Sequence, residues 1–391
     1  MLDIERIRAD TPGCADVIHL NNAGSSLPPR PVVDAVVGYL REEELAGGYE
    51  VAAARQDDLD RVYDESASLI GCSADEIAFT SSASESWWRA FTAIRLDVGD
   101  RVLVSRSEFQ ANAFGWLQLG DRGVTVDIVP NTPSGDFDVI AFDEMLDERV
   151  ALVCLTMISM SNGAVHPAAT VGARLVDHRA IYLLDACQAV GQLPIDVREL
   201  RCDFLNYTGR KFMRGPRGTG VLYARSGVHE ELGPPTFIDG RSATWTGSDA
   251  FDVSATATRF EFGECNYAGK VGLAVATAYA NDIGLEAIET RVSMLSALLR
   301  STLAAIHGVR VLDEGTVQSG IVTFTIDGVP PAEVQSNLSA NGINVSAPGR
   351  TNAQLDLGER GIDQVVRAGV HYFNTEPEID RVAEVVGSIH G

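Results

Sequence analysis

The sequence has no C-x-x-C pair among its 391 residues, and its six cysteines lie far apart. Such spacing favours neither a disulfide framework nor a structural zinc site, so we expect free thiols. The chain also lacks any apolar run near the ~20 residues that a membrane span needs. Its histidines, among them His19, His166 and His371, have no ligand-like spacing. We therefore predict neither a metal site nor a membrane-spanning segment.

Basic residues are scarce relative to acidic ones. Lys and Arg number 31 against 54 Asp and Glu, which gives a net charge of −23 at pH 7. A molecule of this charge repels nucleic acid and anionic membranes, so neither is expected as a partner. The first residues, Met1–Arg8, carry charges where a secretory signal peptide has an apolar stretch. These features predict a cytoplasmic protein.

The first two thirds of the chain alternate short β-branched runs with longer helical patterns. This alternation is typical of a mostly parallel sheet covered by helices. We expect buried strands at 101–105, 124–129, 151–155 and 180–184, and helices at 30–45, 85–96 and 167–178. The sequence therefore predicts an α/β protein with a large domain over residues 15–258.

The last third has a different pattern. One long helical stretch covers residues 266–306, and strands near 320–326 and 364–372 flank a helix at 331–339. Thr375–Glu378 forms a capping box that opens the final helix. We predict a smaller α+β domain over residues 259–391, completed by the N-terminal segment 1–14.

Asp185 and Lys211 carry the strongest chemical signal. An apolar strand ends at Asp185, which places its carboxylate where the carboxyl edge of a parallel sheet opens into a ligand crevice. Pyridoxal phosphate (PLP) needs a carboxylate at its ring nitrogen to act as an electron sink, and a lysine to form a Schiff base. Lys211, in a Thr-Gly-Arg-Lys turn, supplies such an amine.

These motifs resemble those of the class V aminotransferase superfamily, in which a D-x-x-Q motif precedes a lysine motif like that at Lys211. The superfamily has the PLP fold-type I architecture and includes cysteine desulfurases, kynureninases and C–S lyases. The resemblance covers nearly the whole chain. It implies that Asp185 pairs with the pyridine nitrogen, that Gln188 hydrogen-bonds the ring hydroxyl, and that Lys211 is the cofactor anchor and the catalytic base.

The resemblance also implies a phosphate site. Ala83 and Ser84 lie in a loop just before a helix, whose positive end is suited to bind a phosphate. Thr208 and Arg210 look like the remaining phosphate ligands on the same subunit. Phe109 stands where the desulfurases carry a histidine that stacks on the pyridine ring, and a phenyl ring stacks without donating a proton.

Three further residues resemble the family's substrate ligands. Arg367 matches the arginine that binds the α-carboxylate of the amino acid, for which a planar guanidinium is well suited. Asn162 matches an asparagine near the ring hydroxyl and the substrate. Asn22 lies in a turn that resembles the N-terminal substrate loop. The resemblance implies a homodimer, with a site that its two subunits can share.

Two stretches depart from the family pattern. Cysteine desulfurases carry a nucleophilic cysteine on a loop ahead of the carboxylate-binding arginine, but Asn344–Arg350 contains none. Persulfide chemistry is therefore disfavoured. Glu264 stands where the family's threonine contacts the phosphate of the neighbouring subunit. Whether Glu264 or Cys265 reaches a neighbouring site stays open at this point.

The resemblance is strongest to the C–S lyase branch, which includes the ergothioneine-pathway sulfoxide lyase and enzymes that process S-cysteinyl conjugates in lincosamide antibiotic biosynthesis. It implies β-elimination from an S-substituted cysteine or its sulfoxide, with release of a thiol or sulfenate, pyruvate and ammonia. Decarboxylation coupled to oxidative deamination, transamination and epimerisation stay open, because the cofactor motifs do not decide which Cα bond breaks. The alternative to an enzyme is a PLP-binding or cofactor-free scaffold with a regulatory role. Residues 239–247 are expected to form a flexible loop near the site, with Arg241 or Trp245 on the substrate.

Overall fold

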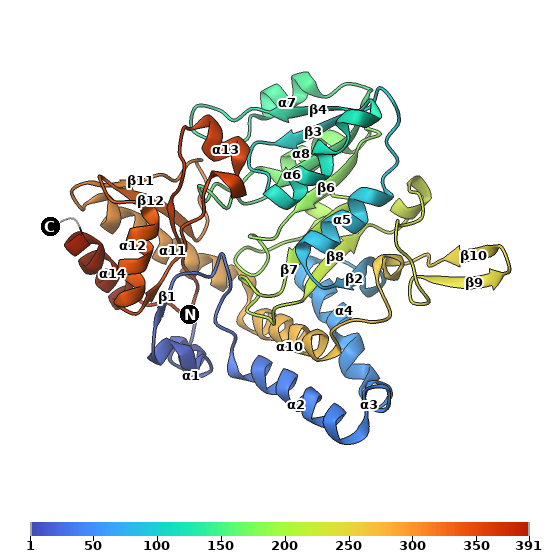
Figure 1. Cartoon of the computed structure of the whole chain (residues 1–391), viewed down its shortest axis with the longest axis horizontal. Coiled ribbons are helices and arrows are strands. Elements are labelled where there is room, and N and C mark those ends of the chain that lie inside the picture. Colours follow the sequence, from blue (N-terminus) through green and yellow to red (C-terminus); the bar gives the residue numbers. More distant parts are fainter. Residues whose placement is uncertain (1, 390–391) are drawn as a thin grey trace.

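The computed structural model describes residues 2–389, and a seven-stranded sheet lies at the centre of this part of the chain (Figure 1). The strand order is β2-β8-β7-β6-β5-β3-β4. β8 runs antiparallel to both of its neighbours, and the remaining neighbouring pairs are parallel. The predicted α/β class with a mostly parallel sheet is confirmed. The strands are β2 (Ile77–Thr80), β3 (Arg101–Ser105), β4 (Thr125–Val129), β5 (Val150–Thr156), β6 (Ile181–Asp185), β7 (Phe204–Thr208) and β8 (Gly220–Ala224).

The sheet is buried on both faces. In β6, Tyr182 and Leu184 belong to the hydrophobic cluster on one face, whereas Ile181 and Leu183 belong to the cluster on the other. Side chains of a strand alternate between faces, so a strand that is covered on both sides must be apolar throughout. This explains why the strands of the sheet read as short continuous apolar runs. Each strand that was predicted from such a run is present, within one residue at either end.

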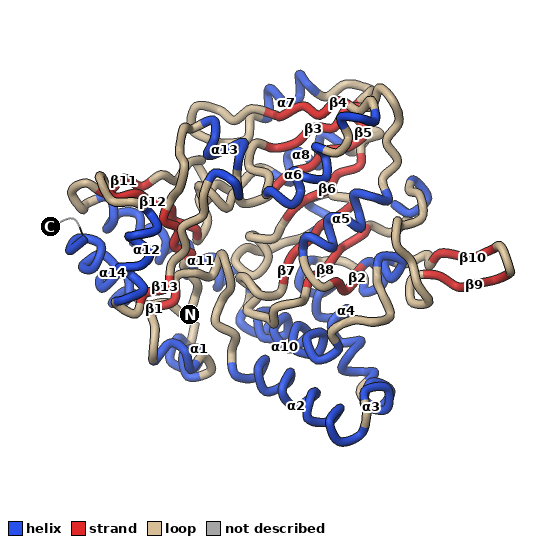
Figure 2. The backbone as a smooth tube through the Cα atoms, in the orientation of Figure 1, coloured by secondary structure: helices blue, strands red, loops and turns tan. Residues whose placement is uncertain are grey.

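Helices surround the sheet, as Figure 2 shows. Helices α2 and α4 pack against α10, and α5 packs against β7 and β8. Helix α5 begins earlier than the sequence predicts, because Ser82 caps it by accepting a hydrogen bond from the Glu85 backbone N–H. In chain order, the α-helices through α10 are α1 (Ile4–Ala9), α2 (Arg30–Ala46), α3 (Gly48–Ala54), α4 (Gln56–Ile70), α5 (Ala83–Ala93), α6 (Gln110–Leu117), α7 (Val139–Met145), α8 (Ala168–Leu175), α9 (Val197–Leu200) and α10 (Tyr267–Ile283).

A second, smaller sheet lies to one side of the first, at the left of Figure 1. It joins the antiparallel strands β11 (Val309–Val311), β12 (Ile321–Ile326) and β14 (Val366–Gly369). Its apolar cluster is separate from those of the central sheet. The helices of this part are α11 (Leu285–Ala304), α12 (Pro331–Ala340), α13 (Gln354–Glu359) and α14 (Glu376–Ile389).

The long helical stretch predicted for 266–306 is two helices. Gly284 separates α10 from α11 with a φ of 87°, a left-handed conformation that glycine adopts without strain. α10 packs on α2 and α4, whereas α11 packs on α14 and the small sheet. The N-terminal strand β1 (Ile18–His19) pairs in parallel with β13 (Ile343–Asn344) and so ties the start of the chain to its last third. The domain boundary after residue 258 stays a prediction.

Residues 243–253 form a hairpin that projects from the body of the protein, at the right of Figure 1. Its strands are β9 (Ala243–Gly247) and β10 (Ala250–Val253). The loop predicted for 239–247 is therefore wrong over residues 243–247. Threonines flank Trp245, and this β-branched and aromatic pattern favours a strand. Trp245 pairs with Phe251 and stays 81% exposed.

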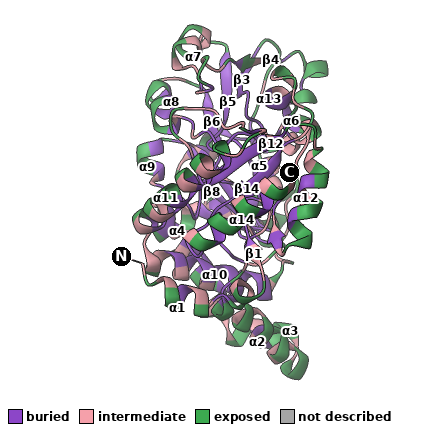
Figure 3. Cartoon of the chain, turned by 90° about the vertical axis from the view of Figure 1, so that its left-hand side faces the viewer, coloured by how far each residue is buried: buried purple, intermediate pink, exposed green. Residues whose placement is uncertain are grey.

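Burial is concentrated at the centre of the molecule, and exposed residues lie mainly on outer helices such as α2 and α3 (Figure 3). Among residues 2–389, no helix combines the length and apolar character needed to cross a membrane.

Candidate active site

A cavity lies at the carboxyl edge of the central sheet. Strands β5, β6 and β7 run parallel, and their last residues, Thr156, Asp185 and Thr208, reach this edge together. The cavity brings together most of the residues predicted from the sequence for cofactor binding. It is lined by Ser82, Ala83, Ser84, Ser107, Phe109, Asn112, Thr156, Ile158, Met160, Asp185, Cys187, Gln188, Thr208, Arg210 and Lys211.

Asp185 is held rigidly at the floor of this cavity. Its Oδ1 accepts a hydrogen bond from the Cys187 backbone N–H at 2.8 Å, and its Oδ2 accepts one from Asn112 Nδ2 at 2.8 Å. The side chain is nearly buried, with 7% exposed. Two hydrogen-bond donors and its place at the end of a strand thus fix the position of the carboxylate. A carboxylate that pairs with a protonated ring nitrogen needs such a fixed position.

Lys211 is one of only two lysines in the sequence. Its Nζ lies in the cavity, 3.2 Å from Cys187 Sγ. The other lysine, Lys270, is buried in α10, where its Nζ donates to the Tyr63 hydroxyl at 2.6 Å and lies 4.4 Å from the centre of that ring. Lys270 does not line the cavity, so Lys211 is the lysine available for a Schiff base.

Gln188 offers an acceptor that no group of the protein uses. Its Nε2 donates to the Ala23 carbonyl at 3.2 Å, but its Oε1 is buried without a hydrogen-bond partner. Buried polar atoms are usually paired, and an orphaned acceptor in a cavity indicates that a ligand supplies the donor. The hydroxyl of a pyridoxal ring would satisfy Gln188 Oε1, as the sequence predicts.

The turn from β2 into α5 forms the part of the cavity that the sequence predicts as the phosphate site. Ala83 and Ser84 form the first turn of α5, where backbone N–H groups point out of the helix end. Gly220 at the start of β8 lies against the backbone of this turn, where a Cβ would come 2.4 Å from the carbonyl carbon of Ser82. A glycine is therefore required for the turn to reach its position.

Thr208 and Arg210 face the same end. The Thr208 hydroxyl donates to the Thr219 carbonyl at 3.1 Å, and the Arg210 guanidinium donates to the Gly24 carbonyl. These groups, with the helix N-terminus, can bind a phosphate by charge and by hydrogen bonds. The donor set, the orphaned Gln188 oxygen and the single available lysine together fit a pyridoxal phosphate cofactor.

Phe109 occupies the N-cap position of α6 and lines the cavity. Its ring is therefore available to stack on a planar cofactor. Glu108, the residue before it, is buried and does not line the cavity.

A buried histidine lies next to the cavity residue Ser107. The Ser107 hydroxyl is 2.8 Å from His166 Nε2. Burial lowers the pKa of His166 to about 4, which keeps this histidine neutral at physiological pH.

Arg367 lies beside the cavity on β14. Its hydrogen bonds are long: Nε to Ser346 Oγ at 3.3 Å and Nη1 to the Met160 carbonyl at 3.4 Å. Burial, and secondarily the charge of Arg210, lowers its pKa to about 10. A buried guanidinium with weak partners and a second cation nearby favours an incoming anion, and a substrate carboxylate is such a group.

The structure does not bring the two predicted asparagines into the cavity lining. The Asn162 amide nitrogen lies 3.3 Å from carboxylate oxygens of Glu314 and Asp356, and its Oδ1 accepts from the Ala164 backbone N–H. The Asn22 amide nitrogen donates to the Gly369 carbonyl at 2.6 Å, and its oxygen accepts from the Ser26 hydroxyl. Both side chains connect the two parts of the fold, and their contact with substrate stays a prediction.

Glu264 and Cys265 lie on the segment before α10, and neither lines the cavity of its own chain. Glu264 is exposed and Cys265 is half-buried. Burial raises the pKa of the Cys265 thiol. Whether either residue reaches a neighbouring subunit stays a prediction. Trp245, on the projecting hairpin, also lies outside the cavity lining.

Asn112 is a site residue that the sequence analysis missed. It lines the cavity and is the side chain that holds Asp185 Oδ2. Glu108 and Asn112 are four residues apart at the start of a helical segment, a spacing that places two side chains on one face. The spacing could have indicated that Glu108 and Asn112 lie on the same side of the segment. It does not indicate that this side faces Asp185.

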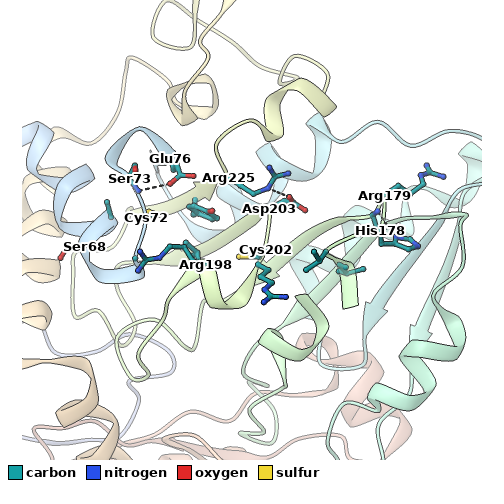
Figure 4. Close-up of a pocket in the computed structure, with 18 residues that line it drawn as sticks. Ser68, Cys72, Ser73, Glu76, His178, Arg179, Arg198, Cys202, Asp203 and Arg225 are labelled. Carbon is teal, nitrogen blue, oxygen red and sulfur yellow. Dashed lines mark hydrogen bonds and ion pairs between the residues drawn. The ribbon is translucent and has the colours of Figure 1, made fainter. Parts of the chain in front are cut away.

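A second cavity, of about 1020 Å³, lies away from this site. Residues of α4, α8 and α9 contribute to its lining (Figure 4). Arginines on its rim are paired with acids: Arg179 with Asp100, and Arg198 with Asp196. Burial raises the pKa of Cys72 there to about 12, so this thiol stays protonated. This second cavity has no lysine and none of the strand-end groups described above, and we do not assign the chemistry to it.

Comparison with known proteins places this site in a family. Residues 18–382 match the family described as Aminotransferase class-V. The chain is 31% identical to a probable cysteine desulfurase of Methanothermobacter thermautotrophicus, over 99% of this chain and 98% of that protein. It is also 31% identical to a probable cysteine desulfurase of Mycobacterium leprae, over 97% and 95% of the two chains.

Solved structures agree with the sequence relatives. The apo structure of a cysteine desulfurase from Thermococcus onnurineus NA1 has a TM-score of 0.92 and 26% identity, and the match covers 100% of this chain and 98% of that one. The predicted fold-type I architecture is therefore confirmed. The matches support the superfamily, with similarity to cysteine desulfurases, and not a particular branch of lyases. The chain belongs to the class-V aminotransferase family, and its cofactor is pyridoxal phosphate.

Proposed function

We propose that the protein cleaves the C–S bond of an S-substituted cysteine or its sulfoxide by β-elimination. The observation that carries this proposal is the segment beside Arg367. Ser346 pairs with Arg367 through two backbone hydrogen bonds of 3.1 and 2.7 Å, so Asn344–Arg350 runs next to the expected carboxylate ligand. This segment has a serine and no cysteine. A persulfide-forming thiol on this segment, as in the desulfurases, is therefore missing.

Cys187 is the cysteine that lines the cavity, and it is poorly suited to replace that thiol. Burial raises the pKa of its thiol, although the Lys211 amine partly opposes this effect. A thiol attacks sulfur as the thiolate, which a raised pKa disfavours. Its Sγ already contacts Lys211 Nζ, so it packs against the anchor of the cofactor. This environment supports a lyase that releases sulfur to solvent over a desulfurase that stores it on the protein.

The residues of the cavity divide the work of such a reaction. Bound pyridoxal phosphate would draw electrons from the Cα of an amino acid attached to it. Lys211 Nζ would take the proton from Cα. Asp185 would keep a proton on the ring nitrogen, and Arg367 would bind the α-carboxylate with its planar guanidinium.

The reaction balances without an oxidant. One S-substituted cysteine and one water give a thiol, pyruvate and ammonium, and the electron pair of the C–S bond leaves with sulfur. A sulfoxide substrate gives a sulfenate in place of the thiol. Phe109 departs from the desulfurase pattern at this position, because a phenyl ring can stack on a planar cofactor but has no proton to give.

A product balance tests the proposal. The PLP-loaded protein is incubated with L-cysteine, S-substituted cysteines and their sulfoxides, and thiol, pyruvate, ammonia, alanine and carbon dioxide are quantified. Equal amounts of thiol and pyruvate from a conjugate are the expected result. Alanine with protein-bound sulfur from free cysteine would identify a desulfurase. Carbon dioxide without pyruvate would identify a decarboxylating reaction, and either outcome would overturn the proposal.

We also propose that the protein is a homodimer. Large apolar side chains are exposed on α2 and α3 and on the projecting hairpin, including Leu45 at 86%, Tyr49 at 80% and Trp245 at 81%. Exposed apolar side chains that gather on projecting elements are typical of a protein–protein contact. A second copy of the chain is the partner that we propose for these side chains.

A further inference from the structure

A second carboxyl group lies behind Asp185, away from the cavity. Glu108 follows β3 and is only 2% exposed. Its Oε1 accepts hydrogen bonds from the Ser105 hydroxyl at 2.9 Å and from the Thr156 hydroxyl at 3.0 Å. A buried carboxyl with hydroxyl partners is satisfied in either protonation state, because a hydroxyl can donate or accept.

Asn112 connects this carboxyl to Asp185. Its Nδ2 donates to Asp185 Oδ2 at 2.8 Å and approaches Glu108 Oε2 at 3.3 Å. An amide nitrogen has two protons, one for each carboxyl group. Asn112 is itself 2% exposed, so water does not compete for these protons. The shorter contact goes to Asp185, which indicates that Asp185 is the stronger acceptor of the two.

Two buried carboxylates that share one donor repel each other when both are ionised. Burial, and then the charge of Asp185, raises the pKa of Glu108 to about 7. The other titratable group that faces Glu108 is the Cys154 thiol on β5, and burial raises its pKa well above the usual value. Asp185 faces the cavity and accepts a further hydrogen bond from the Cys187 backbone N–H, whereas Glu108 does not line the cavity and its further donors are the Ser105 and Thr156 hydroxyls.

We propose that Glu108 is a positioning residue of the cofactor site that holds its proton on the acid side of neutrality, so that Asp185 is then the single negative charge at the ring nitrogen. Neutral Glu108 also leaves Asn112 directed at Asp185. This inference rests on the proposed role of Asp185. When the pH rises, Glu108 releases its proton to solvent and a second negative charge appears behind Asp185. That charge strengthens the hold of the ring nitrogen on its proton and changes the electronic state of the cofactor.

The visible absorbance of bound cofactor, followed across neutral pH without substrate, tests the proposal. Wild type should show a spectral transition with a midpoint near 7, the pKa of Glu108. Glu108→Gln keeps the size and the neutral state of the side chain, and should lose this transition. Asp313→Asn is the matched control, because Asp313 is also a buried carboxyl with a raised pKa but binds Arg300 in the smaller part of the fold. It should titrate as wild type does. A Glu108→Gln protein that still shows the wild-type transition would overturn the proposal.

A second variant keeps the test decisive if Glu108→Gln fails to bind the cofactor. Asn112→Ala leaves both carboxyl groups but removes the shared donor, so their repulsion grows and the midpoint should move to higher pH. An unchanged midpoint would overturn the proposal. Asp185→Asn separates the two levels of the argument. If it leaves both the spectrum and the cofactor affinity unchanged, the proposed role of Asp185 fails; if it changes them while the Glu108 and Asn112 variants behave as wild type, the inference about Glu108 alone fails.

Discussion

Replacing Gly220 with alanine should damage the phosphate end of the site from outside the cavity. A Cβ at this position would lie 2.4 Å from the carbonyl carbon of Ser82, 2.7 Å from its oxygen and 2.8 Å from its Cα. All three atoms belong to the backbone, so no side-chain rotation relieves the overlap. Either β8 or the turn before α5 must shift, and such overpacking costs about 1–3 kcal/mol.

The shift should appear in cofactor affinity as well as in stability. Ser82 caps α5, and the first turn of that helix is the expected phosphate site. Because each 1.4 kcal/mol changes a binding constant about tenfold, a displaced turn should weaken PLP binding by about tenfold or more. The free energy of unfolding of the apoprotein should fall by about 1–3 kcal/mol.

Urea unfolding of the apoprotein and fluorescence titration with PLP measure the two effects. Gly387→Ala is the matched control, since Gly387 lies in α14 and a Cβ there meets no atom within 4 Å. Its unfolding free energy should rise by up to about 1 kcal/mol, because alanine is the better helix former. The reasoning is refuted if Gly220→Ala retains wild-type stability and wild-type PLP affinity.

Other predictions concern the remaining groups of the site. Lys211→Ala should abolish the visible absorbance of the bound cofactor and turnover, whereas Lys270→Met should keep both; retention of the absorbance by Lys211→Ala would contradict the anchor assignment. Arg367→Lys keeps the positive charge but loses the planar fork, so steady-state kinetics should show a KM at least about tenfold higher with an unchanged cofactor spectrum. The folded-state pKa of Glu108 lies above its ordinary value of 4.5, at about 7, so ionisation opposes folding. Stability should therefore decline as pH rises from about 4.5 to about 7 and then level off, by up to about 3 kcal/mol, and denaturant unfolding of Glu108→Gln should show a smaller decline. Light scattering of the purified protein should give about twice the chain mass of 41.8 kDa, and a monomer at micromolar concentration would contradict the dimer.

The sheet and the cofactor motifs could be predicted because their signals are local. Arg101–Ser105 is a strand in both sequence and structure, since a short apolar run between polar turns has few alternatives. Asp185 ends β6 and Lys211 follows β7, and the parallel arrangement of those strands brings their ends to one edge. The chemistry was therefore predictable once the sheet was.

Contacts between distant segments could not be predicted in the same way. The Asn162 amide contacts Asp356, 194 residues further along the chain, and Asn112 reaches Asp185 over 73 residues. The direction of a polar side chain depends on which segment packs against it, and one sequence does not contain that information locally. The same limit applies to Glu108, whose partner Thr156 lies on β5, 48 residues further along the chain.

The small number of lysines described above has a chemical consequence for how the cofactor is acquired. PLP is an aldehyde, and it forms reversible adducts with any accessible primary amine, which in most proteins includes many surface lysines. This chain has two lysines, and Lys270 is closed off against Tyr63 inside α10. The side chains of the protein therefore offer free PLP almost no competing reaction, and Lys211 is the side-chain amine that an amine-directed reagent would mainly reach.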